Sequence, residues 1–172
     1  MEFLELAKAR YSCRKLSDKP VDPEKIARIL EAAIAAPTAK NIQPYKIWKI
    51  TSADALAKVQ QVAKFPFVQQ AKIVLAVGVK ESEAFVRPFD ELNYAQIDGS
   101  IVATHIMLAV EAEGLGTTWV GYFDAPKLQE LIPAMAGYEL IALFPIGYPA
   151  ADAAPSNRHA DRRAISDAVA EI

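Results

Sequence analysis

The stretch NYAQIDGSIVATHIMLAVEAEG, residues 93–114, decides the fold class of this chain. From about Asn93 to Glu113 it predicts the longest helix of the protein, and between Ile101 and Val110 this helix is apolar on nearly every side. Gly114 stands where such a helix would end. A helix that is apolar all round is covered on all sides, so we expect a long, buried central helix.

The segments around this helix alternate between helical and extended patterns. Apolar, β-branched runs predict three strands, and the second of them should lie deepest in the sheet. The three strands are Tyr45–Ile50, Ile73–Val79 and Glu139–Ile146. A short edge strand is also expected at Trp119–Gly121.

Helices are predicted where a capping residue precedes an apolar helical period. Residues 2–9 form one, and Asp22, Ser52 and Asp124 each cap another. The helix that follows Asp22 begins at Pro23. Its expected core stripe is Ile26, Ile29, Leu30, Ala33 and Ile34.

The order of these elements argues against a doubly wound parallel sheet. Two helices precede any strand, and the segment GLGTTWVG, residues 114–121, follows a helix and precedes a strand, which is the wrong order for a dinucleotide fingerprint. We therefore expect an α+β fold with a mixed, largely antiparallel central sheet flanked by helices. Residues 1–172 are expected to form one domain, with residues 149–172 as a tail after the irregular connection PAADAAPSNRHA.

Composition excludes several classes of function. The 19 basic residues nearly balance the 21 acidic ones, so no overall field attracts nucleic acid or anionic lipid. The single cysteine, Cys13, allows no disulfide within the chain, and the two histidines, His105 and His159, are too far apart to suggest a zinc site. The N-terminus lacks a signal-peptide pattern, and no apolar run reaches the about 18 residues of a membrane span. These features favour a cytoplasmic protein.

Two polar segments are candidates for binding a ligand. Arg10, Ser12 and Arg14 would share one face of an extended segment, where their donors suit a phosphate. The alternative is a solvated basic turn paired with nearby acids. The loop APTAKNIQP, residues 36–44, presents uncharged donors and acceptors between two prolines, as cofactor rims require, although helix-end and turn chemistry also accounts for it.

Four segments together resemble the FMN-dependent nitroreductase family. They are RYSCRKL at residues 10–16, APTAKNIQP at 36–44, GLGTTWVG at 114–121 and IALFPIGYP at 141–149, followed by a tail that contains arginines. Their order and spacing are compatible with the family over nearly the whole chain. The resemblance implies a homodimer with bound FMN at the subunit interface and NAD(P)H as reductant.

The resemblance also implies roles for individual residues. Arg10, Ser12 and Arg14 would hold the FMN phosphate and ring edge, and Arg162, with Arg163 as the other candidate, would close over the phosphate from the tail. Thr118 and Gly121 would lie at the flavin, where the Gly121 region offers a backbone N–H to N5. The partner subunit would contribute Pro37, Thr38 and Asn41, and Gln43 of the same loop is a further candidate for cofactor binding.

Three positions depart from the family pattern. Thr38 stands where serine is usual, Tyr45 stands where tryptophan is common, and the tail lacks the lysine that some members place just before the arginine. The contacts to the flavin pyrimidine stay unassigned, with Lys64 as one possibility. Phe85, Phe89 and Tyr94 are candidates for a substrate-facing cover or for plain packing.

No side chain is expected to act as a nucleophile, an acid–base pair or a metal ligand. The sequence holds no Ser-His-Asp set, no HExxH and no phosphate loop that ends in GK[ST]. His105 is expected to be structural and Cys13 a small packing residue. The leading hypothesis is an NAD(P)H-dependent reductase of nitroaromatic, quinone or related acceptors, working in alternating half-reactions. A flavin-binding or flavin-delivering protein and a plain α+β interaction domain are the alternatives.

Overall fold

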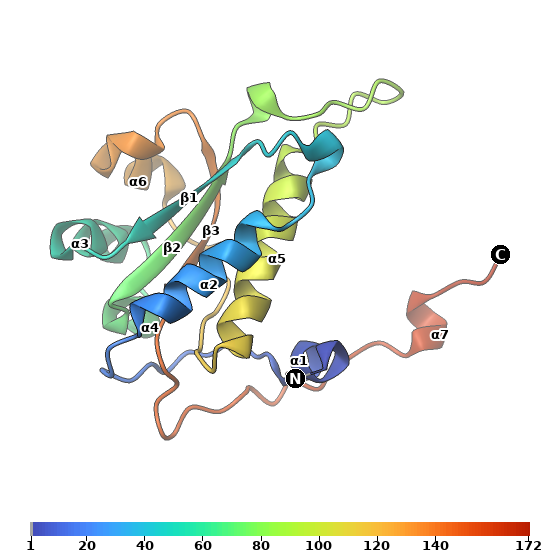
Figure 1. Cartoon of the computed structure of the whole chain (residues 1–172). Coiled ribbons are helices and arrows are strands. Elements are labelled where there is room, and N and C mark those ends of the chain that lie inside the picture. Colours follow the sequence, from blue (N-terminus) through green and yellow to red (C-terminus); the bar gives the residue numbers. More distant parts are fainter. Residues whose placement is uncertain (1) are drawn as a thin grey trace.

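A three-stranded antiparallel sheet forms the centre of the protein (Figure 1). The computed structural model describes residues 2–172. Its strands, β1 (Tyr45–Ile50), β2 (Ile73–Val79) and β3 (Glu139–Ile146), lie in the order β1-β2-β3 and have the bounds that the sequence predicts. Every residue of β2 except the first is buried, which confirms that this strand is the deepest.

Helices cover both faces of the sheet. Successive side chains of β2 point to opposite sides, so this strand contributes to a core on each face. Leu75 and Val77 belong to a core shared with α2 (Pro23–Ile34) and α5 (Ala95–Ala112). Val74 and Ala76 belong to a second core. That core is shared with α3 (Ala53–Val62), α4 (Pro66–Gln70) and α6 (Ala125–Leu131). The predicted α+β fold is confirmed.

The sheet differs from the predicted mixed sheet in being antiparallel throughout. The one parallel pairing among residues 2–172 is an isolated bridge between Ser12 and Thr117. The edge strand expected at Trp119–Gly121 is reduced to one bridge, in which Val120 and Leu143 exchange two backbone hydrogen bonds of 3.0 Å. One bridge is too short a pairing to make a strand.

The remaining elements are short. They are α1 (Phe3–Ala9), α7 (Ile165–Ala168) and three 3-10 turns, η1 (Ala39–Asn41), η2 (Glu81–Glu83) and η3 (Pro133–Met135). The chain after β3 runs along the underside of the molecule past α1, and α7 then projects away from the body (Figure 1). No helix within residues 2–172 has the length and apolarity to cross a membrane.

The predicted helix starts are confirmed by their caps. The Asp22 carboxylate accepts the Glu24 N–H at 2.9 Å. The Ser52 hydroxyl accepts from Ala55, and the Asp124 carboxylate accepts from Lys127. Each bond satisfies one N–H that the first helical turn leaves free.

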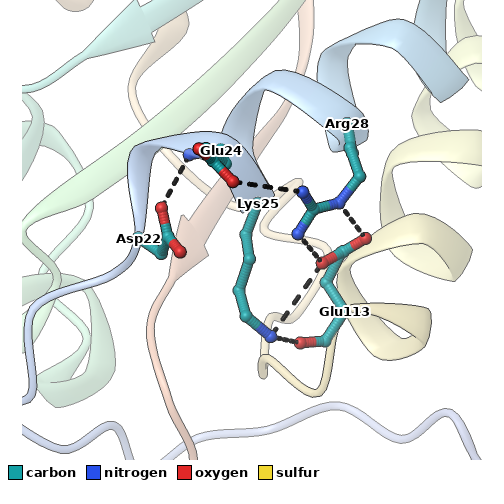
Figure 2. A network of polar contacts seen from close by, with 5 residues as sticks. All are labelled: Asp22, Glu24, Lys25, Arg28 and Glu113. Atoms are coloured by element: carbon teal, nitrogen blue, oxygen red, sulfur yellow. Dashed lines mark hydrogen bonds and ion pairs between the residues drawn. The ribbon is translucent and has the colours of Figure 1, made fainter.

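Charged residues tie the start of α2 to the end of α5 (Figure 2). Arg28 donates two hydrogen bonds of 2.8 Å to the two carboxylate oxygens of Glu113, the C-cap of α5. Lys25 donates to the Glu113 carbonyl oxygen, one of the acceptors left free at a helix end. The Arg28 guanidinium holds the pKa of the Glu113 carboxyl below its ordinary range. This network fixes the two helices of one layer to each other.

Helix α5 packs on the sheet along one side only. Val102, Ala103 and Ile106 are buried there, and a Cβ on Gly99 would lie 2.4 Å from the Val79 side chain, so glycine permits the close approach. The opposite side of α5 lines an open groove of about 670 Å³. The expected stripe of α2 has one error, because Ile34 is 62% exposed.

Candidate functional site

The basic segment predicted from the sequence leaves α1 at Arg10 and runs beside the residues that follow α5. Ser12 pairs with Thr117, and the Cys13 N–H donates to the Thr117 carbonyl at 2.9 Å. Cys13 is 1% exposed, so its buried side chain anchors the segment, and the side chains of its neighbours face outward. A Cβ on Gly116 would lie 2.7 Å from Cys13 Sγ, so glycine is needed at this crossing.

Four arginines converge where this segment meets the tail. Arg10, Arg14, Arg158 and Arg162 line a cavity of about 200 Å³, called here the arginine cavity. No carboxylate of residues 2–172 is part of its wall. Forked guanidinium donors without a competing acid suit a phosphate or another multiply charged anion. The remaining lining residues are Tyr11, Ser12, Ser156 and His159.

The tail contributes to this cavity through specific hydrogen bonds. His159 Nε2 lies 3.0 Å from the carbonyl oxygen of Lys8, to which it donates. Arg162 donates to the carbonyl oxygens of His159 and Asp161, both at 2.7 Å. Arg163 donates instead to the Asp167 carbonyl and is absent from the cavity wall. Of the two tail arginines considered from the sequence, the structure therefore places Arg162 beside Arg10 and Ser12.

Two titratable groups, Tyr11 and Glu111, lie close to the arginine cavity. Burial raises the pKa of Tyr11 to about 12, helped by its hydrogen bond to Cys13, so its hydroxyl is un-ionised at neutral pH. Burial also raises the pKa of the Glu111 carboxyl, and the positive charges of Arg10 and His159 oppose this rise. Glu111 therefore lies close enough to Arg10 and His159 to interact with their charge, although it is not part of the cavity wall.

A second cavity, of about 270 Å³, begins at Arg14. It is called here the aromatic cavity, and its wall includes Thr118 and Gly121. Thr118 is 4% exposed, whereas Gly121 is exposed and a Cβ there would meet no atom closer than 3.5 Å. The remaining lining residues are Phe65, Phe67, Trp119, Val120 and Tyr122. Arg14 lines both cavities, so a ligand bound in the arginine cavity can extend into the aromatic one.

The aromatic cavity continues into a third cavity of about 530 Å³, because Phe65 and Tyr122 line both. Phe65 stands with its ring edge toward Tyr122, at a centroid distance of 6.4 Å. Gln61 and Lys64 supply polar groups to the third cavity. The sequence analysis missed Gln61, Tyr122 and the arginine-cavity residue Arg158, and held Lys64 only as one possibility. For Gln61 and Lys64 a sequence signal was available, because these two polar side chains lie three residues apart around the end of α3.

The polar loop after α2 is not part of these cavities. Its turn η1 is anchored at the start of α5, whereas the basic segment pairs with residues just beyond the end of α5 (Figure 1). The 18 residues of α5 separate the two by about 27 Å. Within one chain, therefore, Pro37, Thr38, Asn41 and Gln43 lie at the opposite end of the molecule from Arg10.

Four other residues considered from the sequence, His105, Phe85, Phe89 and Tyr94, do not line these three cavities. His105 Nδ1 lies 3.1 Å from the Ala32 carbonyl oxygen, so it donates a hydrogen bond that joins α5 to α2. Phe85 packs against Tyr94 and against the ammonium group of Lys40, while Phe89 is 93% exposed. Among residues 2–172 no three His, Cys, Asp or Glu side chains gather as metal ligands.

The fold and the four segments agree with what comparisons with known proteins find. The sequence profile of the nitroreductase family matches residues 7–64 and 60–148. A Methanothermobacter thermautotrophicus protein named NADH dehydrogenase/NAD(P)H nitroreductase is 30% identical over 155 residues, which are 87% of this chain and 78% of that one.

Solved structures give the same result. The crystal structure of a nitroreductase family protein from Clostridium difficile has a TM-score of 0.89 and 33% identity, and the match covers 99% of this chain and 98% of that one. A nitroreductase from Exiguobacterium sibiricum, solved in complex with FMN, has a TM-score of 0.84 at 22% identity, over 100% and 98% of the two chains. This chain belongs to the nitroreductase family.

Proposed function

We propose that this protein is an NAD(P)H-dependent oxidoreductase that binds FMN, with the FMN phosphate in the arginine cavity. The observation that carries the proposal is the convergence of four guanidinium groups and the Ser12 hydroxyl, with no carboxylate from the described chain in the wall. A phosphate monoester carries up to two negative charges and several acceptor oxygens, which match these donors. The residues present therefore fit the phosphate end of FMN.

The same geometry supports a position for the flavin ring. Arg14 leads from the arginine cavity into the aromatic cavity, whose Phe65, Phe67 and Trp119 side chains suit a flat, partly apolar ring. Gly121 is exposed there, and the absence of a side chain leaves its backbone N–H free to donate to flavin N5. We assign Gln61 and Lys64 to the flavin pyrimidine, on the wall of the adjoining cavity.

In the proposed reaction the side chains bind and orient, and none forms a covalent bond. Bound FMN supplies hydride acceptance from a nicotinamide and its return to a second substrate. Arg14 and Lys64 place positive charge at the ring edge, which favours the reduced, negatively charged cofactor. The Phe65 and Tyr122 side chains, on the wall shared by the aromatic cavity and the third cavity, would lie beside the ring.

We further propose that the acceptor is a small planar molecule such as a nitroaromatic or a quinone, reduced in the second of two alternating half-reactions. Tyr122 is 87% exposed at the mouth of the aromatic cavity, where it offers a ring face to such a molecule. The acceptor and the nicotinamide would use the same open side of the flavin in turn. No side-chain acid or base is assigned to either half-reaction.

A homodimer completes the proposal. The polar loop with Thr38 and Asn41 is separated from the arginine cavity of its own chain by the length of α5. It can therefore contact a flavin only in the site of a partner subunit. The outer side of α5 exposes the apolar groove with Ile97 and Ile101, and Phe3 from α1 lines the same groove. We propose that this groove is the dimer contact and that residues 149–172 belong to the same single domain, with the tail packed over the cofactor and against the partner.

Anaerobic spectroscopy tests the proposed function. The protein is saturated with FMN, desalted and titrated with NADH and then with NADPH. Retained flavin bands that bleach with a nicotinamide, and return when a nitroaromatic or quinone is added, are the expected result. Bands that persist under both nicotinamides would support a flavin-binding or flavin-delivering protein instead. A colourless protein after desalting would remove the cofactor assignment.

A further inference from the structure

The best-buried charged group of the described chain has no assigned role in the site. Asp98, in the first turns of α5, is 1% exposed. Its Oδ1 accepts the N–H of Ala39 at 2.9 Å, while Oδ2 has no hydrogen-bond partner within residues 2–172. No cation of this part of the chain pairs with it. Burying a carboxylate without a counter-ion is costly, so a structural reason alone gives little account of an aspartate here.

The bond reaches the loop that the proposed function assigns to the flavin. Ala39 opens the turn η1, and the usual cap at such a start is the side chain of the preceding residue. Here that residue, Thr38, uses its hydroxyl to accept the Gln43 N–H at 3.0 Å instead. The Asp98 carboxylate supplies the acceptor for the N–H of Ala39, the first residue of the turn, across 59 residues of sequence.

This loop needs outside support because its backbone is unfavourable. Lys40, Asn41 and Gln43 have φ values of 51°, 55° and 56°, in the left-handed region that residues other than glycine rarely adopt. Three such residues within four positions persist only where surrounding contacts hold them. Within the loop the Asn41 N–H donates to the Thr38 carbonyl and the Ile42 N–H to the Ala39 carbonyl, and the Gln43 amide donates to the backbone and side-chain oxygens of Asn41. The Asp98 carboxylate adds a side-chain acceptor from a distant part of the chain.

We propose that Asp98 is a positioning residue for FMN binding: through the N–H of Ala39 it holds the Thr38–Gln43 loop in the left-handed form that presents Thr38 and Asn41 to the flavin. This inference rests on the proposed function and adds to it a residue that does not touch the cofactor. Asp98 is suited to the task because a carboxylate bonds an N–H more strongly than a neutral acceptor.

Removing either partner of the bond tests the proposal. Asp98→Ala deletes the acceptor. Ala39→Pro deletes the donor, and the preceding residue is already extended at ψ 160°, the conformation that a residue before proline favours. Each change is expected to weaken FMN binding about tenfold, measured by quenching of flavin fluorescence. The double variant should bind FMN no more weakly than whichever single variant has the lower affinity, because the two substitutions remove the same hydrogen bond.

Two further variants separate positioning from general stability. Asp98→Asn keeps an acceptor for the Ala39 N–H and should restore FMN affinity to within about threefold of wild type. Ile106→Val lies two turns further along α5, is fully buried, and should lower the Tm while leaving FMN affinity unchanged. Wild-type affinity in folded Asp98→Ala, or in Ala39→Pro where Asp98→Ala does not fold, would overturn the proposal. So would an equal loss of affinity in Ile106→Val.

Hydrogen exchange distinguishes failure of this inference from failure of the proposed function. In the protein without FMN, the Ala39 and Gln43 amides should be protected in wild type and exchange faster in Asp98→Ala. If both amides are protected in wild type and exchange faster in Asp98→Ala, but wild type never binds FMN, the proposed function alone is contradicted. A wild-type protein that binds FMN while both amides exchange freely would contradict the role of Asp98 alone.

Discussion

Gly116→Ala should displace the basic segment and so weaken FMN binding without touching any proposed ligand. The Gly116 N–H donates to the Gly147 carbonyl at 2.7 Å, and a Cβ added to Gly116 would lie 2.7 Å from Cys13 Sγ and 2.8 Å from Cys13 Cβ. Carbon atoms pack at about 3.5–4.0 Å, so Cys13 must move by about 1 Å. Overpacking of this kind costs about 1–3 kcal/mol.

Thermal unfolding and FMN titration measure the two consequences. The Tm should fall by about 3 °C for each kcal/mol in a chain of this size. Because Arg10 and Arg14 move with Cys13, their hydrogen bonds to phosphate lengthen, and FMN affinity should fall about tenfold or more. The matched control is the double variant Cys13→Gly/Gly116→Ala, in which the clashing Sγ and Cβ atoms of Cys13 are absent. This double variant should bind FMN more tightly than Gly116→Ala alone. Wild-type Tm and wild-type affinity in Gly116→Ala would refute the reasoning.

Three further predictions concern the phosphate contact, the shared site and the interhelical ion pair. Arg10→Ala should weaken FMN binding about tenfold to a hundredfold, seen by fluorescence titration, and equal affinity for FMN and riboflavin in wild type would contradict a phosphate contact. Hybrid dimers of Arg10→Ala with Asn41→Ala should hold one tightly bound FMN, because one of the two shared sites then has both residues intact; a loop that acts within its own chain would leave no intact site. Arg28 lowers the pKa of Glu113, so the pair stabilises the fold fully above the ordinary glutamate range, and this stability is lost as the pH falls through the lowered value. Urea unfolding followed from neutral pH into that acid range should therefore show a steeper loss in wild type than in Glu113→Gln, and parallel profiles would contradict the prediction.

Much of the fold could be predicted because local patterns and the packed structure agree. All three strands have the predicted bounds, since an apolar β-branched run such as Ile73–Val79 is stable only when buried on both faces. The helix starts follow from side chains that act within three residues of themselves, as at Asp22. Interactions between residues that are close in the sequence can therefore be predicted from the sequence.

The errors arise where distant parts of the chain decide the outcome. Ile34 continues the helical period of α2, but it is the last residue of the helix and no other part of the single chain within residues 2–172 covers it. The left-handed backbone of Lys40 and Asn41 depends on Asp98, which lies far away in the sequence, so no local pattern predicts it. The outer side of helix α5 exposes Ile97 and Ile101 to an open groove, and the proposed dimer contact would account for these apolar residues.

The site was predicted in its parts but not in its arrangement. The alternation of the basic segment placed Arg10, Ser12 and Arg14 together, as the arginine cavity has them. Arg158 joins them only because the tail turns back over α1 through the His159 bond to Lys8. A tail without a regular period gives no sequence signal for such a turn.

The measurement that tests the central claim most directly is the oligomeric state of the purified protein together with the stoichiometry and redox response of its bound flavin. Sedimentation at micromolar concentration, followed by anaerobic absorbance titration, should show a dimer that holds two FMN and whose flavin bands bleach on addition of NADH or NADPH. A monomer that retains FMN tightly, or a dimer whose flavin does not respond to either nicotinamide, would contradict the account.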